Sequence, residues 1–269
     1  MVGHKSTPYL RPMQLYHKTL GAGEPIVILH GLFGMLDNWQ TLAKQLAENY
    51  LIYLVDQRNH GRSPRADTHG YPEMAEDLHD FLRAEGIPAA TILGHSMGGK
   101  TAMQFALTYP EMTERLIVVD IAPKAYPGGH EGIIDALSEL RLERFTGRGD
   151  AEAFLAPRIP ELGVRQFLLK NLTRNKEGGY RLKINLPVLA REYPRILADI
   201  SPEPDATYDG PALFVRGGRS RYVADTDLPR IRTLFPQARL ETVPGAGHWV
   251  HAQAPRELLT QLIDFLKAS

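Results

Sequence analysis

One serine of this chain stands where its hydroxyl group could act as a nucleophile. Ser96 is the central residue of 94–98 (GHSMG), which follows the apolar run 89–93 and precedes the helix-like run 100–109. A strand, a sharp turn and a helix around G-x-S-x-G predict a nucleophile elbow, whereas the five letters alone would also fit a glycine-rich turn with an exposed serine. A Cβ atom on either flanking glycine would clash in so sharp a turn. The helix that follows directs its first N–H groups toward the serine, which favours chemistry that places negative charge there.

A serine hydroxyl needs a base within hydrogen-bond distance and an acid that orients the base. The candidate base is His248, in the glycine-rich loop 244–249 after the last predicted strand. Its small neighbours would let the loop fold back over the edge of the sheet, and the chain order Ser…Asp…His places the base there. The alternative is a surface histidine in a turn. The nearby His251 is more typical of a solvated residue at the entry of a helix.

Three aspartates compete for the role of the acid. Asp120 directly follows the apolar run 116–119, so its side chain could reach a histidine above the sheet. In the loop after the next strand, where an aspartate would also suit the triad, Ser220 occupies the expected position. Asp225 and Asp227 lie a few residues further on, where each could instead cap the following helix. We favour Asp120 because geometry and role define a triad, but Asp225 and Asp227 stay open.

Acyl transfer also needs N–H donors for the oxyanion that develops on the carbonyl group. The backbone N–H of Met97 follows the nucleophile and is the first expected donor. Leu32, in the segment 30–33 (HGLF) after the first buried strand, is the second. His30 is expected to brace this segment by hydrogen bonding rather than to act in catalysis. The residues that we expect to line a substrate pocket are His30, Phe33, Tyr222 and Trp249.

These residues must be positioned by a sheet. Continuous apolar runs, typical of strands buried on both faces, alternate with helical patterns and lie at 25–29, 51–55, 89–93, 116–119 and 212–215. A further strand is expected at 240–243 (LETV). The alternation predicts an α/β protein with a mostly parallel central sheet flanked by helices on both faces. Binding sites in such sheets form beyond the carboxyl ends of the strands, where His30, Ser96, Asp120 and the loop of His248 lie.

The alternation is interrupted between residues 121 and 209. This segment shows helical periodicity without a further buried strand, and it predicts an inserted helical cap above a core formed by residues 1–120 and 210–269. The expected cap helices span 131–145, 151–156, 164–172 and 187–197, and a short extended piece spans 178–184. In the core, Asp37 is expected to cap a helix that runs to about residue 49, with Gln40 as its capping-box partner.

Composition excludes several classes of protein. The 269 residues contain 31 basic and 31 acidic side chains, so no basic field is available for nucleic acid or an anionic membrane. The absence of cysteine excludes disulfides and thiolate chemistry. Residues 1–20 are polar and no apolar run approaches the length of a membrane span, so we expect a soluble, cytoplasmic protein without membrane insertion. The oligomeric state stays open.

No metal or nucleotide cofactor is expected. The histidines that could be imagined as ligands, His30, His60, His248 and His251, include no pair at helical zinc-site spacing and no matching carboxylate. Neither 21–23 (GAG) nor the elbow glycines form a dinucleotide-binding or phosphate-binding loop. The expected partner is therefore a small molecule.

Together these motifs resemble the α/β-hydrolase superfamily over nearly the whole chain, and within it the YbfF-type bacterial esterases. The residues that carry the likeness are 30–31 (HG), 56–63 (DQRNHGRS), the elbow, 119–123 (VDIAP), 217–223 (GGRSRYV) and 247–248 (GH). The resemblance implies a serine carboxylesterase that acts on short- to medium-chain acyl esters, or on thioesters such as acyl-CoA. It also implies that the acid follows the strand after the elbow, as Asp120 does. Ser220 departs from the aspartate of the broader superfamily.

Other functions on the same scaffold stay open. Hydrolysis of carbon–carbon bonds in ring-cleavage products would use the same three side chains and a similar cap. A cofactor-free perhydrolase or haloperoxidase is a further alternative, and a ligand receptor with slow turnover is the non-enzymatic one. The filled triad positions favour turnover over a receptor. A haloalkane dehalogenase would need an aspartate where Ser96 stands.

Overall fold

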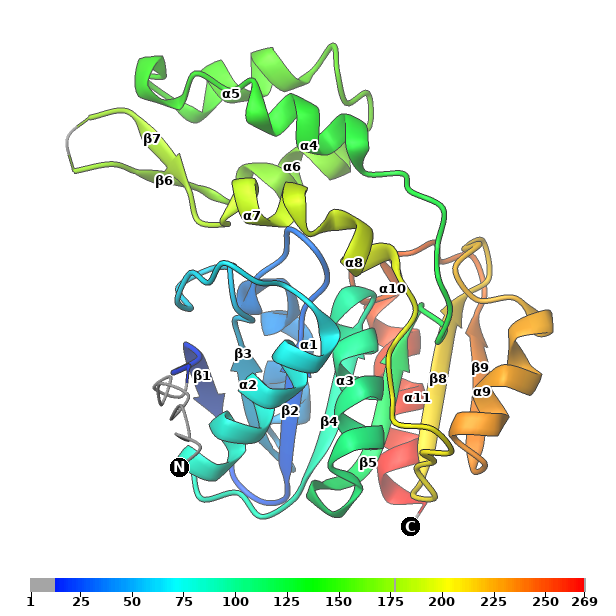
Figure 1. Ribbon diagram of the computed structural model, residues 1–269. Coiled ribbons are helices and arrows are strands. Elements are labelled where there is room, and N and C mark those ends of the chain that lie inside the picture. The colour runs from blue at the N-terminus through cyan, green and yellow to red at the C-terminus, as the bar shows by residue number, and fades with distance from the viewer. Residues whose placement is uncertain (1–12, 177, 269) are drawn as a thin grey trace, which may run out of the picture.

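The computed structural model describes residues 13–176 and 178–268. Its centre is a sheet of seven strands in the order β1-β3-β2-β4-β5-β8-β9 (Figure 1). The strands are β1 (His17–Leu20), β2 (Pro25–Leu29), β3 (Leu51–Val55), β4 (Ala90–His95), β5 (Thr113–Val119), β8 (Ala212–Gly217) and β9 (Ala238–Val243). Neighbouring strands run parallel except β1, which is antiparallel to β3. The predicted mostly parallel α/β sheet is confirmed.

Apolar side chains on both faces hold the sheet between two layers of helices. Successive residues of a strand point to opposite faces, so Ile92 belongs to one core and its neighbour Leu93 to the other. The helices α2 and α3 pack on the face of Ile92, and α1 and α11 pack on the face of Leu93. The core helices are α1 (Gln40–Leu46), α2 (Tyr71–Ala84), α3 (Met97–Thr108), α9 (Leu228–Leu234), α10 (Val250–Gln253) and α11 (Pro255–Lys267). Burial on both faces explains the continuous apolar runs in the sequence.

The segment between β5 and β8 stands above the carboxyl ends of the strands, drawn from green to yellow in Figure 1. Its elements are α4 (Glu131–Ser138), α5 (Arg148–Leu155), α6 (Leu162–Leu169), β6 (Leu172–Arg174), β7 (Tyr180–Leu182), α7 (Leu186–Arg191) and α8 (Tyr193–Leu197). Buried Leu155, Leu168 and Leu189 join this segment to the core that contains α2 and α3. We call it the cap. The inserted helical cap is confirmed, and its limits at residues 121 and 209 stay a prediction.

The start of α1 differs from the sequence prediction. Asp37 does not cap α1 and Gln40 is not a capping-box partner, because a 3-10 turn spans Leu36–Trp39 and α1 begins only at Gln40. The reason lies in β3, which ends beside Asp56. The buried Asp56 carboxylate accepts a hydrogen bond from the N–H of Leu36 at 2.7 Å, which draws the chain into a tight turn before the helix can start.

The cap helices differ from the prediction in their limits, and α5 alone is longer than its predicted range 151–156. The expected helix 131–145 already ends at Ser138, and the expected helix 187–197 is divided into α7 and α8. Pro194 causes this division, since proline lacks an N–H and its ring clashes with the preceding turn. The expected helix 164–172 ends at Leu169, and Leu172 begins β6, which pairs with the predicted extended piece as β7.

Two further features concern what the described residues contain. No helix among them is both long and apolar enough to cross a bilayer. In the same residues, no group of three or more histidine, cysteine, aspartate or glutamate side chains is placed to hold a metal ion. The expectation that the chain begins without an apolar signal core falls largely on residues 1–12, which lie outside the described residues.

Candidate active site

The turn between β4 and α3 holds Ser96 in a strained backbone conformation. Its φ is +53° and its ψ is −119°, in a region that residues with a side chain rarely adopt. A Cβ atom at Gly94 would lie 2.1 Å from the carbonyl oxygen of Gly98, and one at Gly98 would lie 2.5 Å from the carbonyl oxygens of Leu29 and His30. The two glycines are therefore required by sterics. They let the turn close so tightly that Ser96 stands above the sheet.

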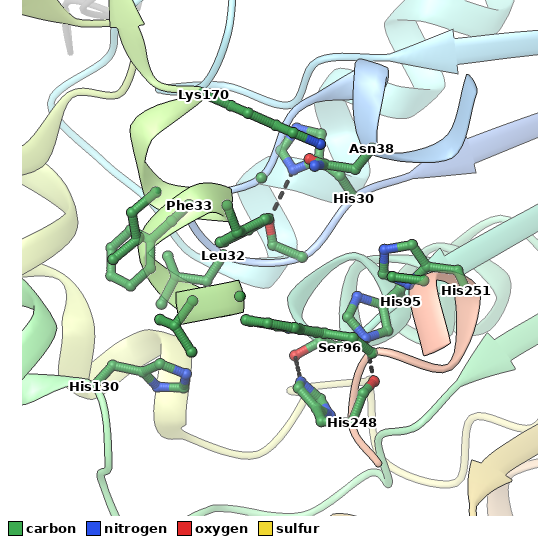
Figure 2. A pocket seen from close by; sticks show the side chains of 18 of the residues that line it. His30, Leu32, Phe33, Asn38, His95, Ser96, His130, Lys170, His248 and His251 are labelled. Carbon is green, nitrogen blue, oxygen red and sulfur yellow. Dashed lines mark hydrogen bonds between the residues drawn. The ribbon is translucent and has the colours of Figure 1, made fainter. Parts of the chain in front are cut away.

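The structure brings Ser96, His248 and Asp120 together from three separate segments. His248 Nε2 lies 3.0 Å from Ser96 Oγ, and Figure 2 shows the two side chains directed toward each other. On the other side of the ring, His248 Nδ1 lies 2.8 Å from Asp120 Oδ2. A carboxylate can only accept, so Nδ1 carries the proton and Nε2 is left to accept from the Ser96 hydroxyl. This is the arrangement of a nucleophile, a base and an orienting acid.

Asp120 is fixed from several directions. It is fully buried and adopts a positive φ of 54° at the end of β5. Its Oδ1 accepts a hydrogen bond from the N–H of Gly217 at 2.9 Å, and its Oδ2 accepts a second from the hydroxyl of Ser220 at 2.5 Å. Ser220 thus does not replace an acid but donates to one. Residue spacing does not predict this contact, although Ser220 stands where an aspartate is expected.

The two competing aspartates lie elsewhere. Asp225 forms an ion pair with Arg216 at 2.7 Å and is exposed. Asp227 binds Lys124 at 2.6 Å and accepts a hydrogen bond from the N–H of Ala224 at 2.9 Å, which caps the turn before α9. Neither carboxylate has a hydrogen bond to His248 among the described residues, so only Asp120 is placed to orient its ring.

His248 is held by contacts with two aromatic neighbours. Its ring stacks on Tyr222, with the ring centroids 3.9 Å apart and the planes inclined by 19°. Its backbone carbonyl accepts a hydrogen bond from Nε2 of His95 at 2.9 Å. Burial lowers the pKa of His95 well below its usual value, so this ring is a neutral donor at Nε2. His95 directly precedes Ser96, and this position in the elbow is the sequence feature that places its ring close to the loop of His248.

The two expected oxyanion donors lie beside the serine. Leu32 and Met97 line the same cavity as Ser96, and no hydrogen bond of the described chain uses either backbone N–H. The next amide is different, because the N–H of Phe33 donates to Nε2 of His60 at 3.2 Å. Burial lowers the pKa of His60 to about 3, so its ring is neutral and able to accept. The geometry thus leaves the N–H of Leu32, not that of Phe33, free to face a substrate oxygen.

His30 anchors the segment that carries Leu32. Its Nε2 accepts a hydrogen bond from the N–H of Gln57 at 3.0 Å, and its backbone carbonyl accepts from the Gln57 side chain at 2.7 Å. Its Nδ1 donates to the carbonyl oxygen of Gly31 at 2.9 Å. Burial lowers the pKa of His30 to about 4, which keeps the ring neutral in this role.

Two cavities meet at Ser96. The larger has a volume of about 480 Å³, lies between the core and α6, and contains the predicted lining residues His30, Phe33, Tyr222 and Trp249. The ring of Trp249 packs against Phe167 of α6 with centroids 5.3 Å apart, so core and cap close this cavity together. The smaller has a volume of about 260 Å³ and also contains Tyr222. The close view in Figure 2 shows side chains of the larger one.

The expectation for His251 is wrong. The residue does enter a helix, the short α10, but its ring is not solvated. It stacks on Trp39 with centroids 4.6 Å apart and meets His95 edge-on at 4.7 Å. Burial lowers its pKa to about 3. The four-residue helix α10, which the sequence analysis did not predict, turns this ring inward beneath the loop of His248.

The chain is similar to known proteins over most of its length. A protein-family profile described as alpha/beta hydrolase fold matches residues 24–255. The chain is 39% identical over 268 residues to a mouse protein named sn-1-specific diacylglycerol lipase ABHD11, covering 96% of this chain and 86% of the relative. It is 41% identical to Esterase YbfF of Escherichia coli strain K12, covering 90% of this chain and 92% of the relative. A solved structure titled Marine microorganism esterase superposes with a TM-score of 0.92 at 42% identity, covering 94% of this chain and 99% of the other.

Proposed function

The chain belongs to the α/β hydrolase fold family, and from this premise we propose that it is a serine carboxylesterase whose triad is Ser96, His248 and Asp120. The observation that carries the proposal is the relay of 3.0 Å and 2.8 Å from the strained serine through the imidazole to a buried carboxylate. Relatives named esterase and diacylglycerol lipase support the class of reaction, which is hydrolysis of a carboxylic ester. Short- to medium-chain acyl esters, or the corresponding thioesters, are the proposed substrates.

In the first half of the reaction, Ser96 Oγ bonds to the acyl carbonyl carbon while its proton passes to His248 Nε2. The electron pair of the carbonyl bond moves to the oxygen, where the N–H groups of Leu32 and Met97 stabilise the negative charge. When the tetrahedral intermediate collapses, the bond to the leaving oxygen or sulfur breaks. His248 gives that atom its proton, and Asp120 stabilises the imidazolium until it does so.

In the second half, a water molecule attacks the carbonyl carbon of the acyl-enzyme and gives a proton to His248. The bond from carbon to Ser96 Oγ then breaks, and His248 returns the proton to the serine. The free acid leaves, and Ser96, His248 and Asp120 regain their starting protonation. The two cavities on either side of Ser96 provide room for the two parts of an ester.

The test is turnover of p-nitrophenyl esters from acetate to laurate by the wild-type chain and by Ser96→Ala. We expect turnover by the wild type and a loss of about a millionfold in kcat for the variant, as for other serine hydrolases that lose the nucleophile. Ser138→Ala, on an exposed turn of α4, is the matched control and should retain wild-type turnover. Turnover that survives in Ser96→Ala would remove the proposal. A vinylogous diketone in the same assay tests carbon–carbon bond hydrolysis, which should be slower than ester hydrolysis.

A further inference from the structure

The smaller cavity beside Ser96 is lined by two cationic side chains. Its lining includes the positively charged side chains Lys100 and Arg221, and it includes no aspartate or glutamate among the described residues. Much of the remaining wall is aromatic, supplied by Tyr71, Tyr126, Tyr193 and Tyr222. A cavity of about 260 Å³ that adjoins the nucleophile therefore carries positive charge without its own counter-charge.

Lys100 is the deeper of the two cations. It lies on α3, is only 1% exposed, and its Nζ is 4.9 Å from the ring centroid of Tyr126 and 5.4 Å from that of Tyr71. Its Nζ donates to the carbonyl oxygens of Ala198 at 2.5 Å and Leu197 at 3.4 Å. An ammonium group has three N–H donors, so these two carbonyls leave one donor without an acceptor among the described residues. The two aromatic rings stabilise part of the positive charge, but no anion in the same residues neutralises it.

No carboxylate neutralises either cation within the described residues. Asp199 raises the pKa of Lys100, but less than burial lowers it, and the Asp199 carboxylate is itself bound by Arg230. Arg221 is exposed at the cavity and forms no hydrogen bond or ion pair with the described residues. A buried charge without a partner is costly, and lysines are almost never fully buried unless paired. A ligand that brings a carboxylate would supply the missing partner.

We propose that this smaller cavity is a carboxylate subsite, in which Lys100 binds the negatively charged end of the substrate's acyl chain and Arg221 attracts it at the opening. The inference rests on the proposed ester hydrolysis at Ser96. Among the proposed substrates, it singles out monoesters or thioesters of short dicarboxylic acids. Neutral acyl esters of similar length remain substrates.

The assignment to the acyl part follows from the positions of His248 and Met97. The leaving atom must lie close to His248 Nε2, which protonates it, and His248 lines the larger cavity but not the smaller one. The N–H of Met97, which would face the acyl oxygen, belongs to a residue that lines the smaller cavity. The leaving group thus extends into the larger cavity and the acyl chain into the smaller.

The spacing along α3 sets the length of the chain. The N–H of Lys100 donates to the carbonyl oxygen of Ser96, so the two residues lie one helical turn apart. One turn rises about 5.4 Å, and the lysine side chain leans toward the N-terminal end of the helix, so the gap suits a short acyl chain, and the glutaryl group is the probe that we choose for it.

The charged groups around Lys100 are Arg221 in the cavity lining and Asp199, which raises the pKa of Lys100, whereas the tyrosine and histidine side chains of the cavity stay neutral at neutral pH. Burial raises the pKa values of Tyr71 and Tyr126 far above the neutral range, and it lowers the pKa of His130. Burial lowers the pKa of Lys100 to about 8. Lys100 is therefore the group in the cavity whose charge changes just above neutral pH, and recognition of a carboxylate should weaken as pH rises through about 8.

The decisive experiment compares ethyl hydrogen glutarate with ethyl valerate, two esters that differ by a terminal carboxylate in place of a methyl group. Hydrolysis is followed by titration of the released acid for the wild type, Lys100→Met and Lys170→Met. We expect the wild type to favour the glutarate ester in kcat/KM. Lys100→Met should reduce that preference by about ten- to a hundredfold, mainly through KM, as expected for a lost hydrogen bond to a charged group. Lys170→Met removes a lysine from the larger cavity and should leave the preference unchanged.

Several results would overturn the subsite. Equal losses for both esters in Lys100→Met would mean that Lys100 only holds the cap through Leu197 and Ala198. A preference for the butyrate ester of glycolate, whose carboxylate is on the alcohol part, would reverse the assignment of the cavities. If Lys100→Met does not fold, inhibition of the wild type by glutarate is compared with inhibition by butyrate. Equal inhibition constants would contradict the proposal, as would glutarate inhibition that does not weaken as the pH rises through about 8.

The same measurements separate this inference from the proposed function. If ethyl valerate is hydrolysed in a Ser96-dependent manner but no preference for the glutarate ester exists, the carboxylate subsite alone is wrong. If no ester is hydrolysed, the proposed function is wrong. In that case, calorimetric titration of glutarate into the wild type and Lys100→Met still tests the subsite, which predicts binding that the variant loses.

Discussion

The edge of the sheet and the cap are attached in very different ways. At the edge, Asp120 has three hydrogen-bond partners, and His248 is fixed through both its ring and its backbone. The cap combines helices of five to eight residues with the strand pair β6 and β7. Polar links that join it to the core include Asn171 to Phe33 at 2.7 Å and Tyr71 to Ile196 at 2.5 Å. The difference indicates that the chemistry depends on side chains fixed at the edge of the sheet, whereas the selection of substrate depends on the contacts between the cap and the core.

Among the changes that test this comparison, removal of the carboxylate charge that orients His248 should have the largest effect on activity. Asp120→Asn keeps the shape of the side chain but favours the wrong tautomer of the imidazole, so we expect kcat for p-nitrophenyl butyrate to fall by about ten thousandfold. Asp225→Asn and Asp227→Asn change the same chemical group outside the relay and should leave kcat within about twofold of the wild type. A large loss in either control with a small loss in Asp120→Asn would place the acid outside the edge of the sheet.

The contrast between edge and cap also explains what the sequence could predict. Ser96 and Asp120 follow strands whose apolar runs are continuous, and His248 lies in the loop after the last predicted strand. Their meeting at one edge therefore follows from the positions of the strands in the sequence. The hydrogen bond from Ser220 to Asp120 depends instead on how two loops lie in space, and residue spacing carries no information about it. In the cap, the residues 187–197 follow one helical pattern, which hides the break at Pro194. A proline fits the first turn of a helix, so it does not by itself show that α7 ends and α8 begins.

A change where the cap meets the core should affect substrate binding more than the chemical step. Asn171 is fully buried and its Nδ2 donates to the carbonyl oxygen of Phe33, next to the expected oxyanion donor Leu32. Asn171→Leu removes this link at similar volume, so we expect KM to rise by about five- to twentyfold with a smaller change in kcat. Asn175→Ala, on the exposed turn between β6 and β7, is the control and should leave both constants unchanged. A loss confined to kcat in Asn171→Leu would show that the cap takes part in positioning the chemistry.

A falling pH should progressively destabilise the core around the edge of the sheet, because this region buries neutral histidines. Burial lowers the pKa of His30 to about 4 and the pKa values of His60 and His251 to about 3. In the unfolded chain these groups titrate near 6.5, so below that pH the unfolded state binds more protons. The stability present above pH of about 6.5 is therefore lost as the pH falls toward 4.

His251→Phe tests this pH dependence with the smallest expected effect. The substitution keeps the stack on Trp39 but removes one buried titratable ring, so the fall in Tm between pH of about 7 and 5 should be smaller than in the wild type. Thermal unfolding at a series of pH values measures it. His79→Phe, which replaces a partly exposed histidine stacked on Tyr109, is the control and should preserve the wild-type slope. Identical slopes for all three proteins would show that the buried ring at position 251 does not contribute.

The central claim is that the edge of the sheet activates Ser96, and covalent labelling tests it without any assumption about the substrate. A fluorophosphonate probe reacts with a serine hydroxyl only when a base removes its proton and the phosphoryl oxygen is stabilised. We expect stoichiometric labelling, located by peptide mass spectrometry on Ser96, and its loss in His248→Ala. A wild-type protein that stays unlabelled, or a label on Ser96 that His248→Ala does not diminish, would contradict it.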